Sequence, residues 1–314
     1  MHEFLGHTHW LGRRFRVLRR RVLRVPANRT KRDFARRLDS LVATPIESPR
    51  TLDVHLFSLC GQRSFLDLVV ALRSFLRNVG APSATTILSD GTLTARHRAI
   101  FEAHSGVRVV ELAAIRAQIA PAMLSFIEEK LPNYLFTPKL LLLIAASQSD
   151  QPALYADSDV VFFPAPDLAP LLDFAGDLWY LPDGAPSLDP RLLAQTQPPR
   201  GATPVDARLL AQSAQTQTPV NAGLCLFGRR PAWDAALEPL RSFSGVPNHI
   251  SEQTLVHNMM HFNGAKPLPG DRFLLLLDDV LRRDDQAIEG GAAARHYVGS
   301  VRHKMWLLPA PFYT

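Results

Sequence analysis

The chain contains 314 residues, of which 46% are hydrophobic and 20% are charged, enough to fill the core of one large α/β domain or two small ones. This composition excludes a disordered protein, and the lack of a short sequence period excludes collagen-like, coiled-coil and solenoid proteins. The net charge of +6 originates in the N-terminal segment, because residues 1–40 hold 12 Arg or Lys against 3 acidic residues, and the remaining 274 residues carry −3.

Residues 1–45 form a basic arm whose apolar residues recur at spacings of three and four. This stripe consists of Leu11, Phe15, Leu18, Val22 and Val25. Arginines cover most of the remaining surface, and we expect the helix to end near Pro26. Such a helix docks on an anionic membrane surface, here through residues 11–25; packing on its own domain and binding to nucleic-acid phosphates are alternatives. Of these we favour the membrane and expect no specific nucleic-acid partner.

The cysteines and the apolar runs indicate the cellular compartment of the protein. Cys60 and Cys225 are too few for a disulfide framework, so a reducing environment is expected. The uncharged apolar runs, such as residues 140–147, are far shorter than the ~20 residues that cross a bilayer. Arg outnumbers Lys 30 to 5, which is typical of bacteria with GC-rich genomes. We therefore expect a cytoplasmic bacterial protein that lies peripherally on the inner face of the cytoplasmic membrane.

Residues 46–314 alternate between apolar strands and amphipathic helices. The predicted strands are 54–59, 85–88, 108–112, 153–155 and 224–227, and the predicted helices are 64–78, 94–104 and 134–146. Strands alternating with helices indicate an α/β domain with a mostly parallel sheet that binds ligands at the carboxyl ends of its strands. No strand is followed by the glycine motif of a dinucleotide site or a P-loop.

Residues 182–219 interrupt this pattern with a stretch rich in Pro, Gln, Ala and Thr. The segment Arg-Leu-Leu-Ala-Gln occurs in it twice, at 191–195 and at 208–212. Loops this long inside a compact domain are usually lids or binding loops. We predict an insertion within one domain, and the sequence leaves open whether it is a lid or a disordered segment without a role.

Two carboxylates follow the strand at 153–155, on Asp157 and Asp159. Because residues i and i+2 of a strand face the same way, we expect both side chains to enter one space. Carboxylates this close repel each other unless a cation lies between them, and the apolar strands on either side leave them few other partners. The spacing therefore predicts a divalent metal whose coordination is completed by substrate phosphates, with a solvated turn as the alternative.

Four segments occur in a characteristic order after the β-α-β start. They are Tyr-Ala-Asp-Ser-Asp-Val at 155–160, Val-Asn-Ala-Gly-Leu-Cys-Leu-Phe at 220–227, Glu-Gln-Thr-Leu at 252–255 and His-Tyr-Val-Gly at 296–299. Residues 51–306 thereby resemble glycosyltransferase family 8, whose members have the GT-A fold, a Rossmann-like mixed and mostly parallel sheet flanked by helices. The resemblance implies transfer of a hexose, with retention, from a nucleoside diphosphate sugar, with UDP as the leading candidate, to an acceptor hydroxyl. The basic arm suggests that this acceptor is a glycan or a lipid-linked molecule of the cell envelope.

The resemblance also implies roles for single residues. The implied metal ligands are Asp157, Asp159 and His296, a set that suits Mn²⁺ or Mg²⁺. The implied catalytic groups, near the donor sugar or its reacting carbon, are Lys139, Glu252 and Gln253. The implied donor-binding residues are Asn221, Ala222, Gly223 and Gly299. Two purely structural interpretations remain possible: Asn-Ala-Gly at 221–223 forms a tight turn before the strand at 224–227, and Glu252 lies at a helix N-terminus, where the dipole favours an acidic residue.

The sequence departs from the family pattern in two places. The last motif usually reads His-x-x-Gly-x-x-Lys-Pro-Trp, so that here either Arg302 or Lys304 reaches the diphosphate. The acidic or Asn residues that often follow the first strand are replaced by Ser-Leu-Cys-Gly-Gln-Arg at 58–63, which leaves Ser58 and Asp90 as nucleotide contacts. Two alternatives therefore stay open: a non-catalytic, membrane-associated binding or scaffold protein, and a nucleotidyltransferase or nucleotide-sugar hydrolase.

Overall fold

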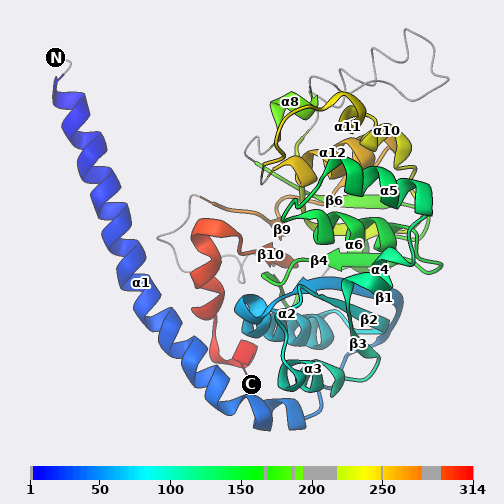
Figure 1. Ribbon diagram of the computed structural model, residues 1–314. Helices are drawn as coiled ribbons and strands as arrows, with labels where there is room; N and C mark the ends of the chain where they lie inside the picture. The colour runs from blue at the N-terminus through cyan, green and yellow to red at the C-terminus, as the bar shows by residue number, and fades with distance from the viewer. Residues whose placement is uncertain are drawn as a thin grey trace.

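The computed structural model describes residues 3–165, 168–184, 188–193, 218–248, 250–277 and 291–313. A 41-residue helix, α1 (Glu3–Ala43), precedes a mixed α/β body (Figure 1). The strands are β1 (Thr51–Cys60), β2 (Ala81–Ser89), β3 (Val107–Val110), β4 (Ala153–Ala156), β5 (Val160–Phe162), β6 (Leu178–Pro182), β7 (Val220–Phe227), β8 (Lys266–Pro267), β9 (Phe273–Leu274) and β10 (Ala294–His296). The helices are α2 (Phe65–Asn78), α3 (Ala95–Glu102), α4 (Leu112–Arg116), α5 (Pro121–Lys130), α6 (Thr137–Ser147), α7 (Ala169–Leu172), α8 (Pro190–Leu193), α10 (Asp234–Leu237), α11 (Pro239–Ser242), α12 (Ser251–Phe262), η2 (Gly299–Trp306) and η3 (Ala310–Tyr313), with a short turn η1 (Gln62–Ser64) before α2.

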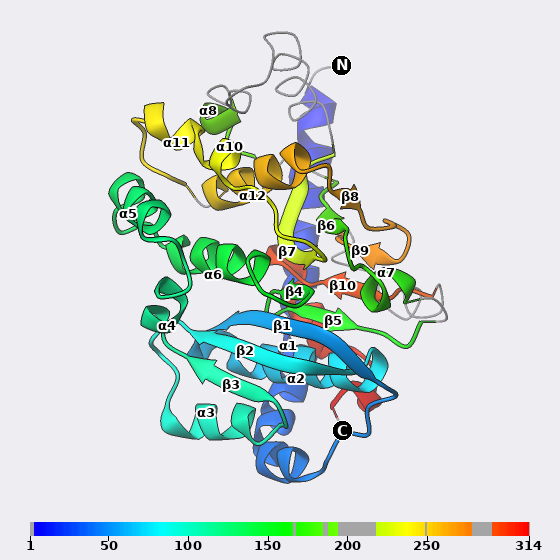
Figure 2. The same ribbon diagram turned by 90° about the vertical axis from the view of Figure 1, so that its right-hand side faces the viewer.

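The main sheet has seven strands in the order β3-β2-β1-β4-β7-β6-β8 (Figure 2). The pairs from β3 to β4 are parallel, and β7 runs antiparallel to both β4 and β6. A second sheet has the order β5-β10-β9, with β10 antiparallel to β5. The predicted α/β class with a mostly parallel sheet is confirmed, and so are the strands and helices expected between residues 54 and 110.

Two hydrophobic cores lie on opposite faces of the main sheet. In β4, Leu154 and Ala156 belong to the core that includes α2, whereas Ala153 and Tyr155 belong to the core that includes α6 and α12. The central strands are therefore apolar on both faces, as expected of parallel strands between two helical layers. This arrangement places the end of β4, and the polar residues that follow it, between the two layers.

Helix α1 does not end near Pro26 as predicted; it continues to Ala43 with Pro26 inside it. Its second half packs on the body, where the fully buried ring of Phe34 lies 5.5 Å from the ring of Trp306 and 6.2 Å from that of Tyr313. These contacts with the other end of the chain stabilise the helix beyond the proline, which interrupts the helical hydrogen bonding. The first half of α1 extends away from the body (Figure 1).

Most of the insertion predicted at 182–219 lies outside the described residues. The structure describes residues 182–184, 188–193, which include the short helix α8, and 218–219 of this segment. Across the described part of the chain, no helix is both long enough and apolar enough to cross a membrane.

Candidate metal and donor site

The carboxylates of Asp157 and Asp159 converge in a turn between β4 and β5, and not along a strand as expected. The N–H of Asp157 donates to the carbonyl of Gly223 at 2.8 Å, and the N–H of Val160 donates to the carbonyl of Asp157 at 3.1 Å. Strand alternation is therefore not what aligns the pair. The turn, anchored to β7, brings the two side chains together.

His296 reaches this turn from the second sheet, because β10 pairs with β5 and sets His296 opposite Val160. Its Nε2 lies 3.1 Å from Oδ1 of Asp159 and 3.6 Å from Oδ2 of Asp157. One ligand atom from each of the three residues lies within 4.8 Å of the other two. Two oxygen ligands and one imidazole nitrogen in this space fit Mn²⁺ or Mg²⁺.

Asn221 fixes the orientation of the His296 ring. Its Oδ1 accepts the N–H of Gly223 at 2.9 Å, which identifies this atom as the oxygen, and it also lies 2.9 Å from Nδ1 of His296. The ring therefore carries a proton on Nδ1, and Nε2 faces the two carboxylates. This is the arrangement by which proteins present an imidazole nitrogen to a metal ion.

A bulge in β7 makes this contact possible. Pairing with β6 shifts between Tyr180, opposite Cys225, and Leu181, opposite Asn221, so three residues of β7 lie between these two pairs. Bulges redirect side chains beside functional sites. The interpretation of Asn-Ala-Gly as a turn before a strand at 224–227 is wrong, because the motif lies within β7. Of its residues, Ala222 is fully buried in the core.

Each carboxylate also has a cationic neighbour. Nζ of Lys139 donates to Oδ2 of Asp157 at 3.0 Å, and Nε of Arg302 lies 3.2 Å from Oδ2 of Asp159. Burial acts to lower the pKa of Lys139, but Asp157 and Glu252 outweigh it and raise that pKa. Burial likewise acts to raise the pKa of Asp159, but His296 and Arg302 hold it below its ordinary value. Lys139 is therefore charged at neutral pH and Asp159 is ionised.

Glu252 lies in the first turn of α12, as the helix-terminus interpretation expected, and its side chain is buried beside Lys139. Its N–H donates to the hydroxyl of Tyr134 at 3.1 Å, and Oε1 lies 3.8 Å from Nζ of Lys139. Burial raises the pKa of Glu252 to about 7; Lys139 opposes this rise and Asp157 adds to it. Near neutral pH this carboxyl group therefore occurs in both protonation states.

This raised pKa makes stability depend on pH. The pKa of Glu252 rises from 4.5 to about 7 on folding, so the folded state binds more protons between these values and loses stability as the pH increases. We expect Glu252→Gln to remove about 2–3 kcal/mol of the decrease in unfolding free energy between pH 5 and pH 8. Urea unfolding of both proteins at the two pH values measures this.

Asp189→Asn is the matched control, because hydrogen bonds from Arg191 hold the pKa of buried Asp189 below 3.8. Its contribution is fully present at both pH values, so this variant is expected to lose the same stability at pH 5 and at pH 8. Equal pH slopes for wild type and Glu252→Gln would contradict the assignment of the raised pKa to Glu252.

Gln253 contacts Asn221 of β7 and Asp183, the residue after β6. Its Nε2 donates to Oδ2 of Asp183 at 3.4 Å, and its Oε1 accepts from Nδ2 of Asn221 at 3.5 Å. Asp183 and Tyr155, whose hydroxyl donates to Asp157 at 2.5 Å, were not among the residues expected from the sequence. The sequence contains a signal for Tyr155: it lies two residues before Asp157 at the end of a strand, so its side chain is expected on the same side as that of Asp157.

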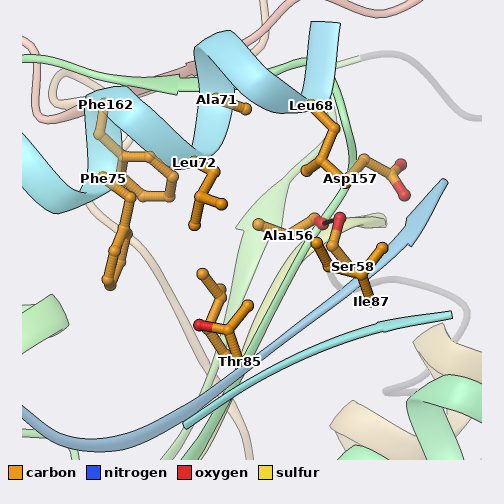
Figure 3. A pocket seen from close by; sticks show the side chains of 11 residues that line it. Ser58, Leu68, Ala71, Leu72, Phe75, Thr85, Ile87, Ala156, Asp157 and Phe162 are labelled. Carbon is orange, nitrogen blue, oxygen red and sulfur yellow. Dashed lines mark hydrogen bonds between the residues drawn. The ribbon is translucent and has the colours of Figure 1, made fainter. Parts of the chain in front are cut away.

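Ser58 and Asp90 lie outside this cluster. Ser58 is 2% exposed and its hydroxyl donates to the carbonyl of Ala156 at 2.7 Å. It lines an apolar pocket under α2, and Figure 3 shows Asp157 at the edge of that pocket. Asp90 is exposed at the end of β2, so close to Gly61 that a Cβ at Gly61 would lie 1.8 Å from its Oδ2.

The two basic candidates of the last motif differ in exposure. The side chain of Arg302 is 43% exposed and reaches Asp159, whereas Lys304 is 2% exposed and buried in η2. Gly299 begins η2 with a φ of +59°, a conformation that favours glycine. The partly exposed side chain of Arg302 is therefore more accessible to a ligand than that of Lys304.

No family model and no curated protein matches this sequence. Among solved structures, the chain is similar to the galactosyltransferase LgtC in complex with donor and acceptor sugar analogues (16% identity over 78% of this chain and 87% of that chain, TM-score 0.46). It is also similar to mouse xyloside xylosyltransferase 1, with 13% identity over 78% of this chain and 97% of that chain and a TM-score of 0.49. A third similar structure is the glycosyltransferase GlyE of Streptococcus pneumoniae TIGR4, with 11% identity over 84% of this chain and 60% of that chain and a TM-score of 0.45. At this level of similarity, the chemistry of the chain has to be inferred from its own residues.

Proposed function

We propose that this chain is a metal-dependent, retaining glycosyltransferase that moves a hexose from a nucleoside diphosphate sugar, with UDP as the leading nucleotide, to a glycan or lipid-linked acceptor. The observation that carries the proposal is the meeting of Asp157 and Asp159, in the turn between β4 and β5, with His296 of β10, which belongs to a different motif. The order of these motifs along the chain, which resembles that of family 8, supports the same reaction.

The residues around the cluster suit this chemistry. A bound Mn²⁺ or Mg²⁺, held by Asp157, Asp159 and His296, would neutralise the charge of the leaving diphosphate. Arg302 adds a second positive charge facing the same space, and Lys139 donates a hydrogen bond to Asp157. The carboxamide of Gln253 is a poor nucleophile, so we assign it to positioning the sugar and not to covalent catalysis.

The test is release of the nucleoside diphosphate from a panel of UDP-, GDP- and dTDP-sugars, with and without Mn²⁺. Release from one sugar that depends on Mn²⁺ is the expected result, and it identifies the donor. Exchange of pyrophosphate into the donor would instead indicate a nucleotidyltransferase. If no nucleotide of the panel binds, the proposal is wrong and a scaffold protein takes its place.

We further propose that the acceptor lies at a membrane, because residues 11–25 form a basic part of helix α1, and the first half of this helix points away from the body (Figure 1). Exposed arginines continue along the helix at Arg24, Arg29, Arg32, Arg36 and Arg37. A polybasic helix is attracted to anionic lipids by roughly 1 kcal/mol per charge near the surface.

Co-sedimentation with vesicles tests this docking. We expect binding to vesicles with 30% phosphatidylglycerol, about tenfold weaker binding to pure phosphatidylcholine, and loss of binding when four arginines of the arm are replaced by Gln: Arg13, Arg16, Arg19 and Arg20. The control removes the same charge from exposed arginines of the body, namely Arg63, Arg116, Arg229 and Arg241. Equal effects of the two sets would mean that the arm is not a docking site.

A further inference from the structure

Asp67, in the first turn of α2, is a buried carboxylate outside the metal cluster, 3% exposed. It has partners from two other elements. Nζ of Lys31 on α1 donates to its Oδ1 at 2.6 Å, and the indole N–H of Trp306 donates to the same oxygen at 2.9 Å. Its other oxygen, Oδ2, lies 3.3 Å from Nε of Arg302. This buried carboxylate therefore accepts two hydrogen bonds and has a second cation close to its other oxygen.

Arg302 connects this carboxylate to the metal cluster. Its Nε lies between Oδ2 of Asp67, at 3.3 Å, and Oδ2 of Asp159, at 3.2 Å. Its Nη2 donates to the hydroxyl of Ser158 at 3.0 Å, between the two aspartates of the motif. The side chain is nevertheless 43% exposed although its Nε is buried, so part of it stays accessible to a ligand.

We propose that Asp67 is the positioning residue that holds Arg302 at the metal cluster, ready to bind a diphosphate; this inference rests on the proposed function. A long arginine side chain loses rotamer freedom when it binds a phosphate, and a fixed partner restricts that freedom in advance. Asp67 does not reach the cluster itself; it acts through Arg302.

Lys31 gives helix α1 a part in the same arrangement. The carboxylate of Asp67 is buried and would be poorly compensated without both cations. The ammonium of Lys31 also lies 5.1 Å from the centre of the Trp306 ring, and the ring of Phe34, one turn further along α1, packs on Trp306. Helix α1 is thus both the basic arm and a support of the donor site.

Calorimetric binding of UDP in the presence of Mn²⁺ tests the inference in the full-length chain. We expect Asp67→Asn, which keeps the size of the side chain, to weaken binding about five- to tenfold, and Lys31→Gln to weaken it less. In an Arg302→Ala background, Asp67→Asn is expected to add no further loss, because the two changes remove one interaction. Equal losses with and without Arg302 would overturn the proposal.

Asp39→Asn is the matched control. Asp39 pairs with Arg96 at 2.9 Å and so connects α1 to α3, and its carboxylate does not contact Arg302. We expect it to bind UDP like the wild type. A loss as large as that of Asp67→Asn would indicate a general effect of loosening α1, and would also overturn the proposal.

A readout without nucleotide separates this inference from the proposed function. The Nε–H of Arg302, assigned by Arg302→Lys, is expected to give a ¹H–¹⁵N signal in wild type that shifts or broadens in Asp67→Asn, because Asp67 lies 3.3 Å from this nitrogen, while the thermal midpoint shows a folded protein. An unchanged signal overturns the positioning role. If wild type binds no nucleoside diphosphate, the proposed function fails, and this signal still decides whether Asp67 holds Arg302.

Discussion

Asp159→Asn is expected to abolish Mn²⁺-dependent release of nucleoside diphosphate while the protein stays folded. Asp159 is 4% exposed and faces both His296 and Arg302, so the amide removes one anionic ligand without changing the packing. Loss of one preorganised electrostatic contact typically lowers turnover by roughly 10²–10³-fold, and loss of the metal itself by at least as much. Turnover is measured on the best donor of the panel at saturating Mn²⁺.

Binding of Mn²⁺ alone, followed by the loss of the free-ion signal in electron paramagnetic resonance, shows whether the metal is the reason. We expect Asp159→Asn to bind Mn²⁺ at least about tenfold more weakly than the wild type. Asp177→Asn, which removes a partly exposed carboxylate paired with Lys266, should leave both measurements unchanged. Wild-type Mn²⁺ affinity in Asp159→Asn would show that the cluster is not the metal site.

Local patterns in the sequence were sufficient for the parallel strands from β1 to β4 and for the proximity of the two aspartates, although a turn and not strand alternation brings the two carboxylates together. Strand and helix periods are local, and a carboxylate pair at a strand end is visible within six residues. The geometry that unites the cluster is different, because Asp157 and Asp159 meet His296 only through the pairing of β5 with β10. That pairing joins segments more than 130 residues apart, and only the resemblance to a family pointed to it.

For Ser58, the alternation of residues along β1 is enough to predict the direction of the side chain. It lies on the same face of β1 as Leu56 and Cys60, both in the core that includes α2, so its side chain points into that layer. The end of α1 had no local signal. A proline normally ends a helix, and here the contact of Phe34 with Trp306, near the opposite end of the chain, outweighs it.

Asp67 and Asn221 illustrate roles that no spacing reveals. Asp67 reads as an ordinary acidic residue in the first turn of a helix, where the dipole favours it. Its contacts with Lys31 and Arg302 require α1 and η2 to meet on α2. Asn221 faces His296 only because β7 is bulged, and a bulge is set by the pairing of strands and not by the residues alone.

Gly223→Ala is expected to disrupt the cluster from the backbone side. A Cβ at this position would lie 2.2 Å from Cε1 and 2.4 Å from Nδ1 of His296, and 2.8 Å from Oδ1 of Asn221. The ring has little room to yield, because His296 is 2% exposed and held by the pairing of β10 with β5. We expect Mn²⁺ affinity to fall by about 10–100-fold and the free energy of unfolding by about 1–3 kcal/mol.

Two comparisons identify the ring as the cause. Gly184→Ala adds the same methyl group where nothing lies within 4 Å, and it should change stability by no more than about 0.5 kcal/mol. In a His296→Ala background the methyl group of Gly223→Ala no longer meets the ring, so its further effect on unfolding free energy should shrink. A full effect in that background would show that the bulge of β7, and not the space left for His296, requires glycine at this position.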